Sequence, residues 1–138
     1  MSRGVTLEPV TRLFTYCIPV DDGAAPNPYW SVCTLAICKP VIRRTAQVGD
    51  WVAGTGSKAA GGRDLSGRLV YAMRVSSVMT LAEYDAWTVE HLPAKIPDPT
   101  SPDLRRRVGD SIYDWSSGQP QQRTGVHLDA NMKRDLGV

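Results

Sequence analysis

Two apolar runs joined by a glycine-rich linker hold the residues of this chain best suited to bind a planar ligand. Residues 51–53 (WVA) precede the linker, and residues 69–73 (LVYAM) follow it. Trp51 and Tyr71 are expected on neighbouring strands. Hydroxyl and cationic side chains occupy the linker at Thr55, Ser57, Lys58, Arg63 and Arg68. A flat apolar surface edged with hydroxyls and cations suits a stacked base or a similar planar, partly anionic ligand.

Candidate ligand-binding roles follow from residue type. Aromatic side chains are expected to stack on a base, hydroxyl and amide groups to read its edges, and cations to steer phosphate. The candidates for stacking are Trp30, Trp51 and Tyr71. Those for reading base edges are Asn27, Thr55 and Ser57, and those for steering phosphate are Arg43, Arg44 and Lys58. Most aromatic residues of a small domain belong to its core, so one or two of these rings are expected to face a pocket. A merely solvated surface is an open alternative for the cations.

The linker has only a superficial likeness to a phosphate-binding loop. Residues 54–58 (GTGSK) lack the Gly-Lys-Ser/Thr ending of that motif, and no helical pattern follows to offer its N-terminal amides. Two interpretations stay open for this segment, namely a flexible loop over a ligand and a plain hairpin loop.

Catalytic and metal chemistry have weaker support. In an enzyme, His127 is the candidate general base, with Asp50 or Asp110 to orient it. Cys33 and Cys38 lie five residues apart in an apolar run, a spacing more typical of buried packing residues than of metal ligands. We therefore expect no metal and no cofactor.

Length and composition fit one ordinary globular domain. The chain has 138 residues, of which 42% are hydrophobic and 22% charged, with 16 basic and 14 acidic residues and a net charge of +2. Three cysteines without a CxxC pair favour a reduced, cytoplasmic protein. No apolar run approaches the roughly 20 residues of a membrane helix, so no membrane partner is expected. We expect a loose lead-in over residues 1–9 and one domain over residues 10–138.

Strand patterns outnumber helix patterns. Residues 13–18, 51–53 and 69–73 are expected as strands, with an extended continuation to 79, and residues 32–38 fit a buried strand or a short helix equally well. Residues 21–28 read as an exposed loop. The best helix spans residues 80–90, because Thr80 and Glu83 have capping-box spacing. Four prolines within residues 93–102 indicate an irregular surface segment. These patterns predict an α+β, mostly β domain with one or two helices, closer to a small barrel than to a doubly wound sheet.

Several ordered motifs give the chain a family resemblance. They are residues 25–30 (APNPYW), 33–36 (CTLA) with 38–40 (CKP), 42–46 (IRRTA), 48–51 (VGDW) with 54–57 (GTGS), and 69–75 (LVYAMRV), with a weaker match at 109–113 (GDSIY) and His127. In this order they resemble the nucleotide modification associated domain 2 family. That resemblance implies an association with phage or bacterial systems that modify DNA bases.

A second likeness concerns the fold. The GDWVAG strand followed by an apolar strand is similar to the PUA-like superfamily, which includes EVE, YTH and ASCH domains. It implies a small β-barrel that holds a modified base against aromatic side chains. Members of the first family are expected to continue into a final apolar strand, whereas this chain ends at residues 136–138 (LGV).

Three hypotheses of function follow. The leading one is a PUA-like module that recognises a modified base or nucleotide, free or within nucleic acid. The second is an enzyme of base or nucleotide modification that uses His127. The third is an accessory subunit of a DNA-modification enzyme, for which an exposed apolar patch is expected beside an unpaired strand.

Overall fold

A three-stranded sheet forms one layer of the molecule. The computed structural model describes residues 9–58, 62–125 and 132–137. Strands β1 (Leu13–Ile18), β2 (Trp51–Gly56) and β3 (Leu69–Arg74) are arranged in the order β1-β2-β3, with β1 parallel and β3 antiparallel to β2. Within the described residues β1 and β3 are the two edges, so this sheet is open.

The two faces of the sheet have different surroundings. Paired residues share a face, so Phe14, Val52 and Met73 lie on one side, which we call the inner face. Leu13, Trp51 and Arg74 lie on the other side, the outer face. Val52 is 1% exposed, whereas Trp51 is 43% exposed. The inner face is therefore the one covered by the rest of the chain.

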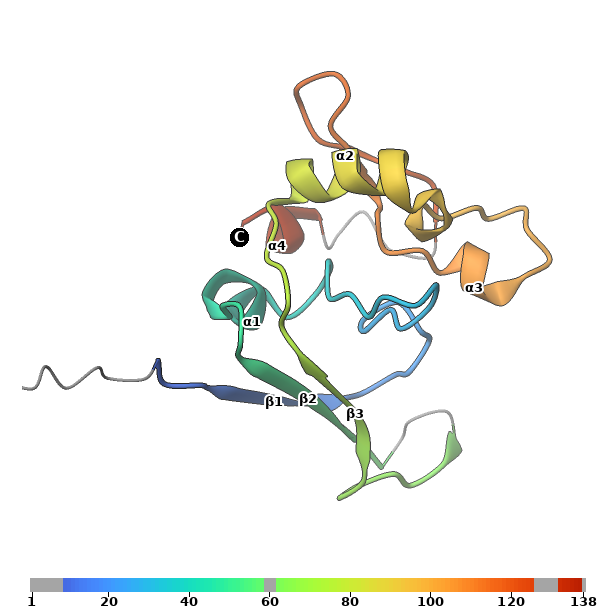
Figure 1. The fold of residues 1–138 in the computed structure, drawn as a ribbon. Coiled ribbons are helices and arrows are strands. Elements are labelled where there is room, and N and C mark those ends of the chain that lie inside the picture. Colours follow the sequence, from blue (N-terminus) through green and yellow to red (C-terminus); the bar gives the residue numbers. More distant parts are fainter. Residues whose placement is uncertain (1–8, 59–61, 126–131, 138) are drawn as a thin grey trace, which may run out of the picture.

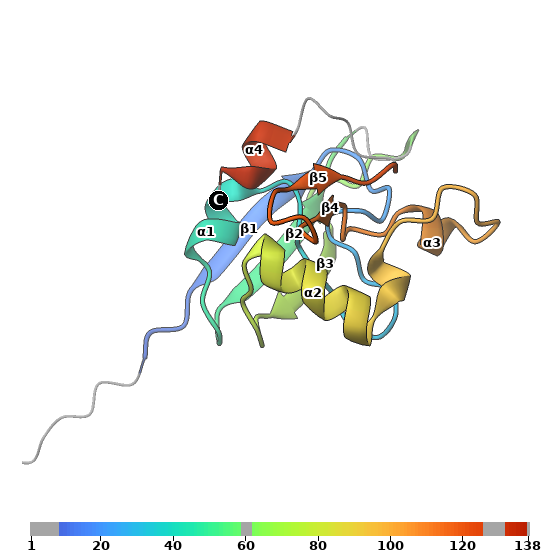
Figure 2. The ribbon, with the colours of Figure 1, turned by 90° about the horizontal axis from the view of Figure 1, so that it is seen from above.

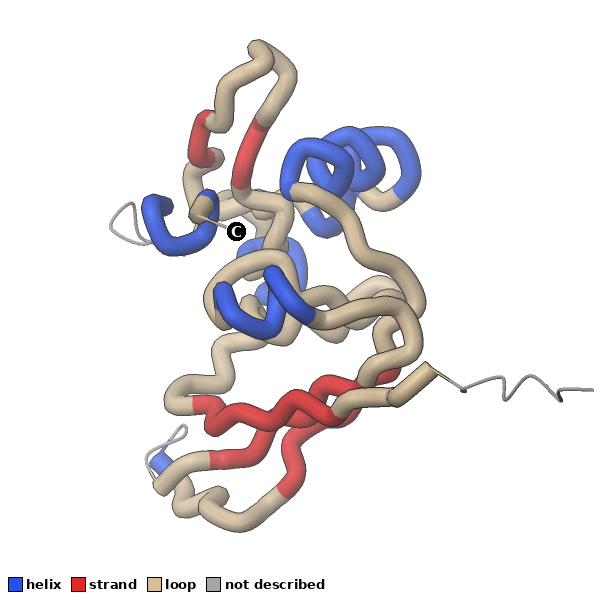
Figure 3. Tube along the Cα trace, turned by 90° about the vertical axis from the view of Figure 1, so that its left-hand side faces the viewer, coloured by secondary structure: helices blue, strands red, loops and turns tan. Residues whose placement is uncertain are grey.

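Helices lie above the inner face. They are α1 (Pro40–Thr45), α2 (Leu81–His91), α3 (Leu104–Arg107) and α4 (Met132–Leu136), together with a 3₁₀ turn, η2 (Pro93–Lys95). Figures 1 and 3 show these helices on one side of the sheet. Figure 2 shows α1 and α4 next to each other at one end and α3 at the other.

The longest helix, α2, begins where the sequence predicts it. The Thr80 hydroxyl accepts from the Glu83 backbone N–H at 3.1 Å, and the Glu83 carboxylate accepts from the Thr80 N–H at 2.7 Å. Two of the otherwise unpaired amides at this helix start are thereby satisfied. The capping box is confirmed.

A small core joins the helical layer to a short hairpin. Strands β4 (Tyr113–Asp114) and β5 (Gln121–Gln122) pair antiparallel. Tyr113 of β4 forms a buried cluster with Ala24, Ile37 and Ile112. This core brings residues 24–37, which are mostly irregular, against the C-terminal third of the chain.

The α+β expectation is confirmed, and several finer ones are corrected. The described residues contain four α-helices rather than one or two. Their strands form one sheet of three strands and one of two, and neither is closed, so the barrel is not confirmed. Residues 32–38 are neither strand nor helix apart from one bridge at Thr34. Residues 41–46 contain most of a helix that the sequence did not indicate.

The proline-rich segment is also corrected in part. It is mostly irregular, as predicted, but it does not lie wholly on the surface, because Lys95 is 0% exposed and Pro97 is buried. None of the described helices is both long and apolar enough to cross a membrane.

Candidate functional site

A cavity of about 490 Å³ lies between the inner face of the sheet and α2. Val52 and Met73 contribute its sheet side, and Tyr84 and Trp87 contribute its α2 side. Residues 75–80, which connect β3 to α2, form a third wall, and residues 32–36 form a fourth. Ligand sites of proteins typically measure about 300–1,000 Å³, so this cavity has a suitable size for a small molecule.

Aromatic and apolar groups dominate the walls. Tyr84 and Trp87 stack with centroids 6.1 Å apart and an interplanar angle of 17°. Met79 and Val32 line the same cavity and are each 39% exposed, so they lie toward its mouth. Flat rings beside flexible apolar side chains suit a planar heterocycle.

A buried polar cluster adjoins the cavity. Lys95 is 0% exposed, and its Nζ donates to the carbonyl of Asn27 at 2.8 Å, to Oδ1 of Asn27 at 2.7 Å, to the carbonyl of Val32 at 2.7 Å and to Oγ1 of Thr34 at 3.0 Å. Four oxygens therefore compensate for its loss of water. Burial nevertheless lowers the pKa of Lys95, and the charge of Asp110 opposes this shift.

Asp110 links this cluster to the cavity wall. Its Oδ1 accepts from the Tyr84 hydroxyl at 2.6 Å, and its Oδ2 accepts from the Thr34 hydroxyl at 2.5 Å. Burial raises the pKa of Asp110, while Lys95 and the two hydroxyls oppose the shift. Thr34 and Tyr84 both line the cavity, so these two residues connect the cluster to its wall.

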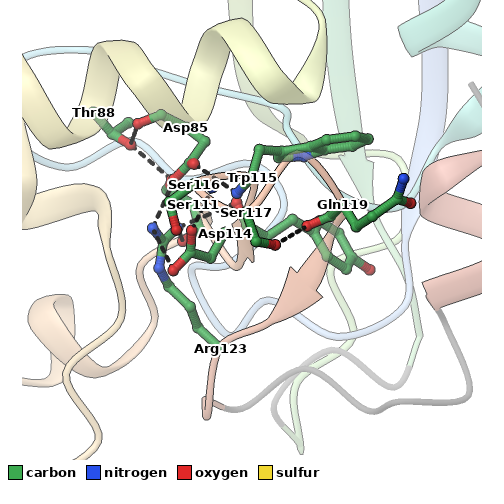
Figure 4. A network of polar contacts seen from close by, with 10 residues as sticks. Asp85, Thr88, Ser111, Asp114, Trp115, Ser116, Ser117, Gln119 and Arg123 are labelled. Carbon is green, nitrogen blue, oxygen red and sulfur yellow. Dashed lines mark hydrogen bonds and ion pairs between the residues drawn. The ribbon is translucent and has the colours of Figure 1, made fainter.

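A second network holds α2 in place (Figure 4). Asp85 on α2 accepts from Nη2 of Arg123 at 2.6 Å and from the Trp115 backbone N–H at 2.8 Å. Thr88, one turn further along α2, shares a 2.7 Å hydrogen bond with the Ser111 hydroxyl. These contacts tie one side of α2 to the β4–β5 hairpin. Since Tyr84 and Trp87 belong to the same helix, the network also fixes the aromatic wall of the cavity.

The three rings predicted to stack on a base do not converge. Trp51 lies on the outer face, whereas Tyr71 pairs with Gly54 on the inner face and hydrogen bonds to the Tyr16 hydroxyl at 2.7 Å. The Trp30 ring lies beneath the Arg105 guanidinium, 4.8 Å from its carbon. The arrangement on which the sequence-based hypothesis relied is thus not formed by these residues.

The predicted amide and hydroxyl groups are mostly engaged elsewhere. Asn27 is 0% exposed, and its side-chain nitrogen donates to the carbonyls of Gly23 at 3.0 Å and Val108 at 2.9 Å. Thr55 donates to the Tyr16 carbonyl at 3.3 Å, and Ser57 donates to the Pro19 carbonyl at 3.4 Å. Asn27 therefore supports the Lys95 cluster from within the fold.

Of the three predicted cations, one lines the cavity. Arg43 is among its lining residues, and its guanidinium pairs with Asp135 at 3.7 Å and donates to the Asp135 carbonyl at 3.0 Å. Arg44 on α1 and Lys58 after β2 are exposed. For all three cations, ligand binding stays a prediction.

The three residues of the enzymatic alternative have different surroundings. His127 lies outside the described residues. Asp50 is 4% exposed and is held by Arg12, whose backbone N–H, Nε and Nη2 donate to it at 3.0, 3.1 and 2.9 Å. Asp110, in contrast, belongs to the cluster beside the cavity.

Sequence reasoning missed the groups that form this site. Thr34, Tyr84, Trp87 and Lys95 were not among the predicted ligand-binding residues. The recurrence of Leu81, Tyr84 and Trp87 at every third position indicated a shared helix face, which is the signal that could have found two of them. Lys95 gives no such signal, because a lysine between prolines reads as a surface residue.

Comparison with known proteins identifies the family of this chain. The described fold is a small α+β domain whose open sheet and α2 enclose a cavity. The model of the nucleotide modification associated domain 2 family matches residues 10–138, and the chain belongs to this family. Its association with nucleotide modification is thereby established at the level of the family. No curated protein and no solved structure matches the chain.

Proposed function

We propose that this chain is a binding module for a modified base or nucleotide, and that the cavity beneath α2 receives the base. The observation that carries the proposal is the combination, in one cavity, of a Tyr84–Trp87 ring pair with hydroxyl groups backed by the Asp110 cluster. Membership of a family associated with nucleotide modification supports the class of ligand.

Each wall of the cavity has a role in this proposal. The Trp87 ring stacks on the base, a contact worth about 1–3 kcal/mol. The hydroxyls of Thr34 and Tyr84 present oxygens to polar atoms of the base edge. Arg43 lines the cavity, so its positive charge attracts the phosphate of a nucleotide. Apolar groups such as Met79 accept the substituent of a modified base.

Titration with nucleotides tests the proposal. The probes are the four ordinary 2′-deoxynucleoside monophosphates and their 5-hydroxymethyl pyrimidine and N6-methyl purine counterparts. We expect at least one modified nucleotide to bind more than tenfold tighter than its ordinary parent. Calorimetric titrations in which no nucleotide binds would overturn the proposal.

A pair of tryptophan variants locates the site. Trp87→Ala removes a ring from the cavity, and Trp51→Ala removes an exposed ring from the outer face. We expect Trp87→Ala to weaken binding about 5- to 150-fold, the equivalent of the stacking contribution. Trp51→Ala is expected to leave it unchanged. The opposite ranking would move the ligand to the outer face.

A rim variant covers the case in which Trp87→Ala unfolds the protein. Met79 lines the cavity and is 39% exposed, so Met79→Glu is expected to fold normally. Its carboxylate repels the phosphate and obstructs the opening. Unchanged nucleotide affinity in Met79→Glu would exclude this cavity as the binding site.

A second candidate function is an enzyme of base or nucleotide modification, favoured by one observation. Asp110 is 1% exposed, has a raised pKa and contacts the cavity through Tyr84. A carboxyl with a raised pKa can retain a proton for acid–base chemistry. Mass analysis of each nucleotide after incubation distinguishes the two functions, since a binding module returns it unchanged. Product formation that Asp110→Asn abolishes would favour the enzyme.

A further inference from the structure

We infer that the cations of α1, of its N-cap residue and of α4 bind the sugar–phosphate backbone of a single-stranded nucleic acid, so that a polynucleotide presents the base to the cavity. The α1/α4 basic surface consists of Lys39, Arg44, Lys133 and Arg134. The inference rests on the proposed function and names its ligand as a base within a strand rather than a free nucleotide.

A buried carboxylate joins the two parts of this surface. Asp135 on α4 is 0% exposed, and its Oδ1 accepts from the Cys38 backbone N–H at 2.9 Å while its Oδ2 accepts from the Tyr113 hydroxyl at 2.9 Å. The Arg43 guanidinium lies 3.7 Å from the same carboxylate. Cations from residues about a hundred positions apart are therefore held side by side. Arg134 illustrates this, because its Nη2 lies 3.4 Å from Sγ of Cys38.

The chain enters α1 in an unusual conformation that places Lys39 on the same surface. Cys38 has a φ of 58° and Lys39 has a φ of 45°, so two consecutive residues other than glycine adopt the left-handed region. Such residues are uncommon and their conformation is held by the surrounding structure. Lys39 Nζ lies 4.6 Å from the centre of the Tyr16 ring.

Lys39 and Arg134 border a cleft of about 330 Å³. Tyr16 and Pro19 contribute to its walls, and Asp22 also lines it. Asp22 accepts a hydrogen bond from the Ala24 backbone N–H at 3.0 Å, which partly satisfies its charge. The cleft thus combines an aromatic ring with two cations, a composition suited to the backbone and sugar of a nucleic acid.

Among the described residues, few acidic groups face this surface. Within the described residues, Lys39, Arg44 and Lys133 form no ion pair, and Arg134 is paired only with Asp135 at 3.9 Å. Asp135 itself is buried and already lies beside Arg43. A chain with a net charge of only +2 therefore concentrates positive charge here. Counterion release from phosphates gives such a surface affinity for nucleic acid.

The spacing between this surface and the cavity fits a short strand. Residues 42, 43 and 46 line the cavity, and residues 39 and 40 line the cleft, so α1 separates the two. A helix of six residues is about 9 Å long at 1.5 Å per residue. Stacked nucleic acid has one phosphate per strand about every 3.4 Å. Two to three nucleotides therefore connect a base in the cavity to phosphates on the basic surface.

The test compares an oligonucleotide with its own nucleotide. The ligands are an eight-nucleotide single strand carrying one modified base, as DNA and as RNA, and the matching modified monophosphate. We expect the strand to bind at least tenfold tighter than the monophosphate at low salt. Its affinity is expected to fall with salt at a logarithmic slope of about 0.7 per phosphate contacted. A strand that binds no tighter than the monophosphate would overturn the inference.

Charge reversal assigns the contacts. Lys39→Glu/Arg134→Glu is expected to reduce the salt slope by about 1.4, the value for two lost phosphate contacts, and to leave monophosphate affinity unchanged. Arg44→Glu/Lys133→Glu, at exposed positions, provides a second test if the first variant does not fold. The control is Arg63→Glu/Arg68→Glu, in the exposed loop between β2 and β3. An equal effect of the control and the test variants would exclude a specific basic surface.

The outcomes separate this inference from the proposed function. Strand and monophosphate binding that are both insensitive to the α1/α4 variants would overturn the inference and preserve the base-binding proposal. A different result would overturn the proposed function and preserve the backbone contact. In that case the strand binds through these cations, the monophosphate does not bind, and the strand shows no selectivity for the modified base.

Discussion

The hydroxyl of Tyr84 donates a 2.6 Å hydrogen bond to Oδ1 of Asp110, although the two residues are 26 positions apart. Tyr84 belongs to the wall of the cavity, and Asp110 belongs to the buried cluster around Lys95. The position of the aromatic wall is therefore coupled to the integrity of a charged cluster. Buried charges of this kind are costly when one partner is removed, which gives the first prediction.

Lys95→Met is expected to destabilise the protein by about 3–5 kcal/mol. Methionine is apolar, so it leaves the oxygens of Asn27 and Thr34 without their donor and Asp110 without its nearest cation. Urea unfolding at pH 7 measures the loss. Because a domain is stable by only about 5–15 kcal/mol, the variant is expected to unfold at much lower urea.

A double variant separates the charge from the packing. Asp110→Asn removes the carboxylate that Lys95→Met leaves uncompensated. We therefore expect Lys95→Met/Asp110→Asn to lose less stability than the sum of the two single variants. Additive losses would show that Lys95 and Asp110 do not interact energetically.

Arg123→Met is expected to destabilise the protein by about 3 kcal/mol. The guanidinium forms a 2.6 Å contact with Asp85, and the two side chains are 18% and 8% exposed. Its loss leaves a nearly buried carboxylate and frees the β4–β5 hairpin from α2. Urea unfolding gives the change in stability, and hydrogen exchange of the hairpin amides gives its location.

The control for this ion pair is a pair at the surface. Arg105 lies 2.8 Å from Asp103, but the side chains are 54% and 34% exposed. Arg105→Met is expected to change stability much less than Arg123→Met does, since water screens exposed ion pairs. Equal losses in the two variants would contradict a special role for the Asp85 network.

Gly109→Ala is expected to cost about 1–3 kcal/mol, as overpacking typically does. A Cβ at this position would overlap the Lys95 carbonyl oxygen and lie 2.8 Å from the Pro97 backbone nitrogen. The carbonyl cannot move freely because it accepts from the Ser111 N–H at 3.0 Å. Gly125→Ala serves as the control, since its nearest neighbour is a Pro97 side-chain atom at 3.3 Å. Thermal unfolding that ranks Gly125→Ala as the more damaging change would contradict this packing.

The parts of the fold that the sequence predicted are those with local signals. The run of β-branched and aromatic residues over Leu13–Ile18 is a strand with the predicted bounds. Thr80 and Glu83 set the start of α2 by hydrogen bonds that span three residues. In each case the interaction that decides the structure lies within the segment itself.

The parts that the sequence did not predict depend on distant contacts. Residues 32–38 remain irregular because the carbonyl of Val32 and the hydroxyl of Thr34 are bound by Lys95, more than 60 positions away. Lys95 itself lies between Pro93 and Pro97 and has no pattern that indicates burial. Trp51 and Tyr71 lie on neighbouring strands as expected, but their rings do not converge because the register places them on opposite faces of the sheet.

Asp50 provides a prediction about pH. The backbone N–H groups of Arg12 and Gln47 donate to its carboxylate at 3.0 and 2.9 Å, and the Arg12 guanidinium adds its charge. These contacts favour the ionised form and lower the pKa of Asp50 below its ordinary value of 3.8. The unfolded state therefore binds the proton more readily than the folded state does.

The sign of the effect follows from this difference. The stability contributed by the Asp50 carboxylate is fully present above pH 3.8 and is lost as the pH falls through the lower, folded pKa. Asp50→Asn is expected to be less stable at pH 7 and to lose less of its remaining stability between pH 4 and pH 2.5, because its side chain does not titrate. Asp21→Asn, at an exposed position, is the control. Urea midpoints measured across this range check the assignment. A parallel decline in the midpoints of Asp50→Asn and the parent chain would contradict it, since the hydrogen bonds from Arg12 and Gln47 would then contribute equally to both protonation states.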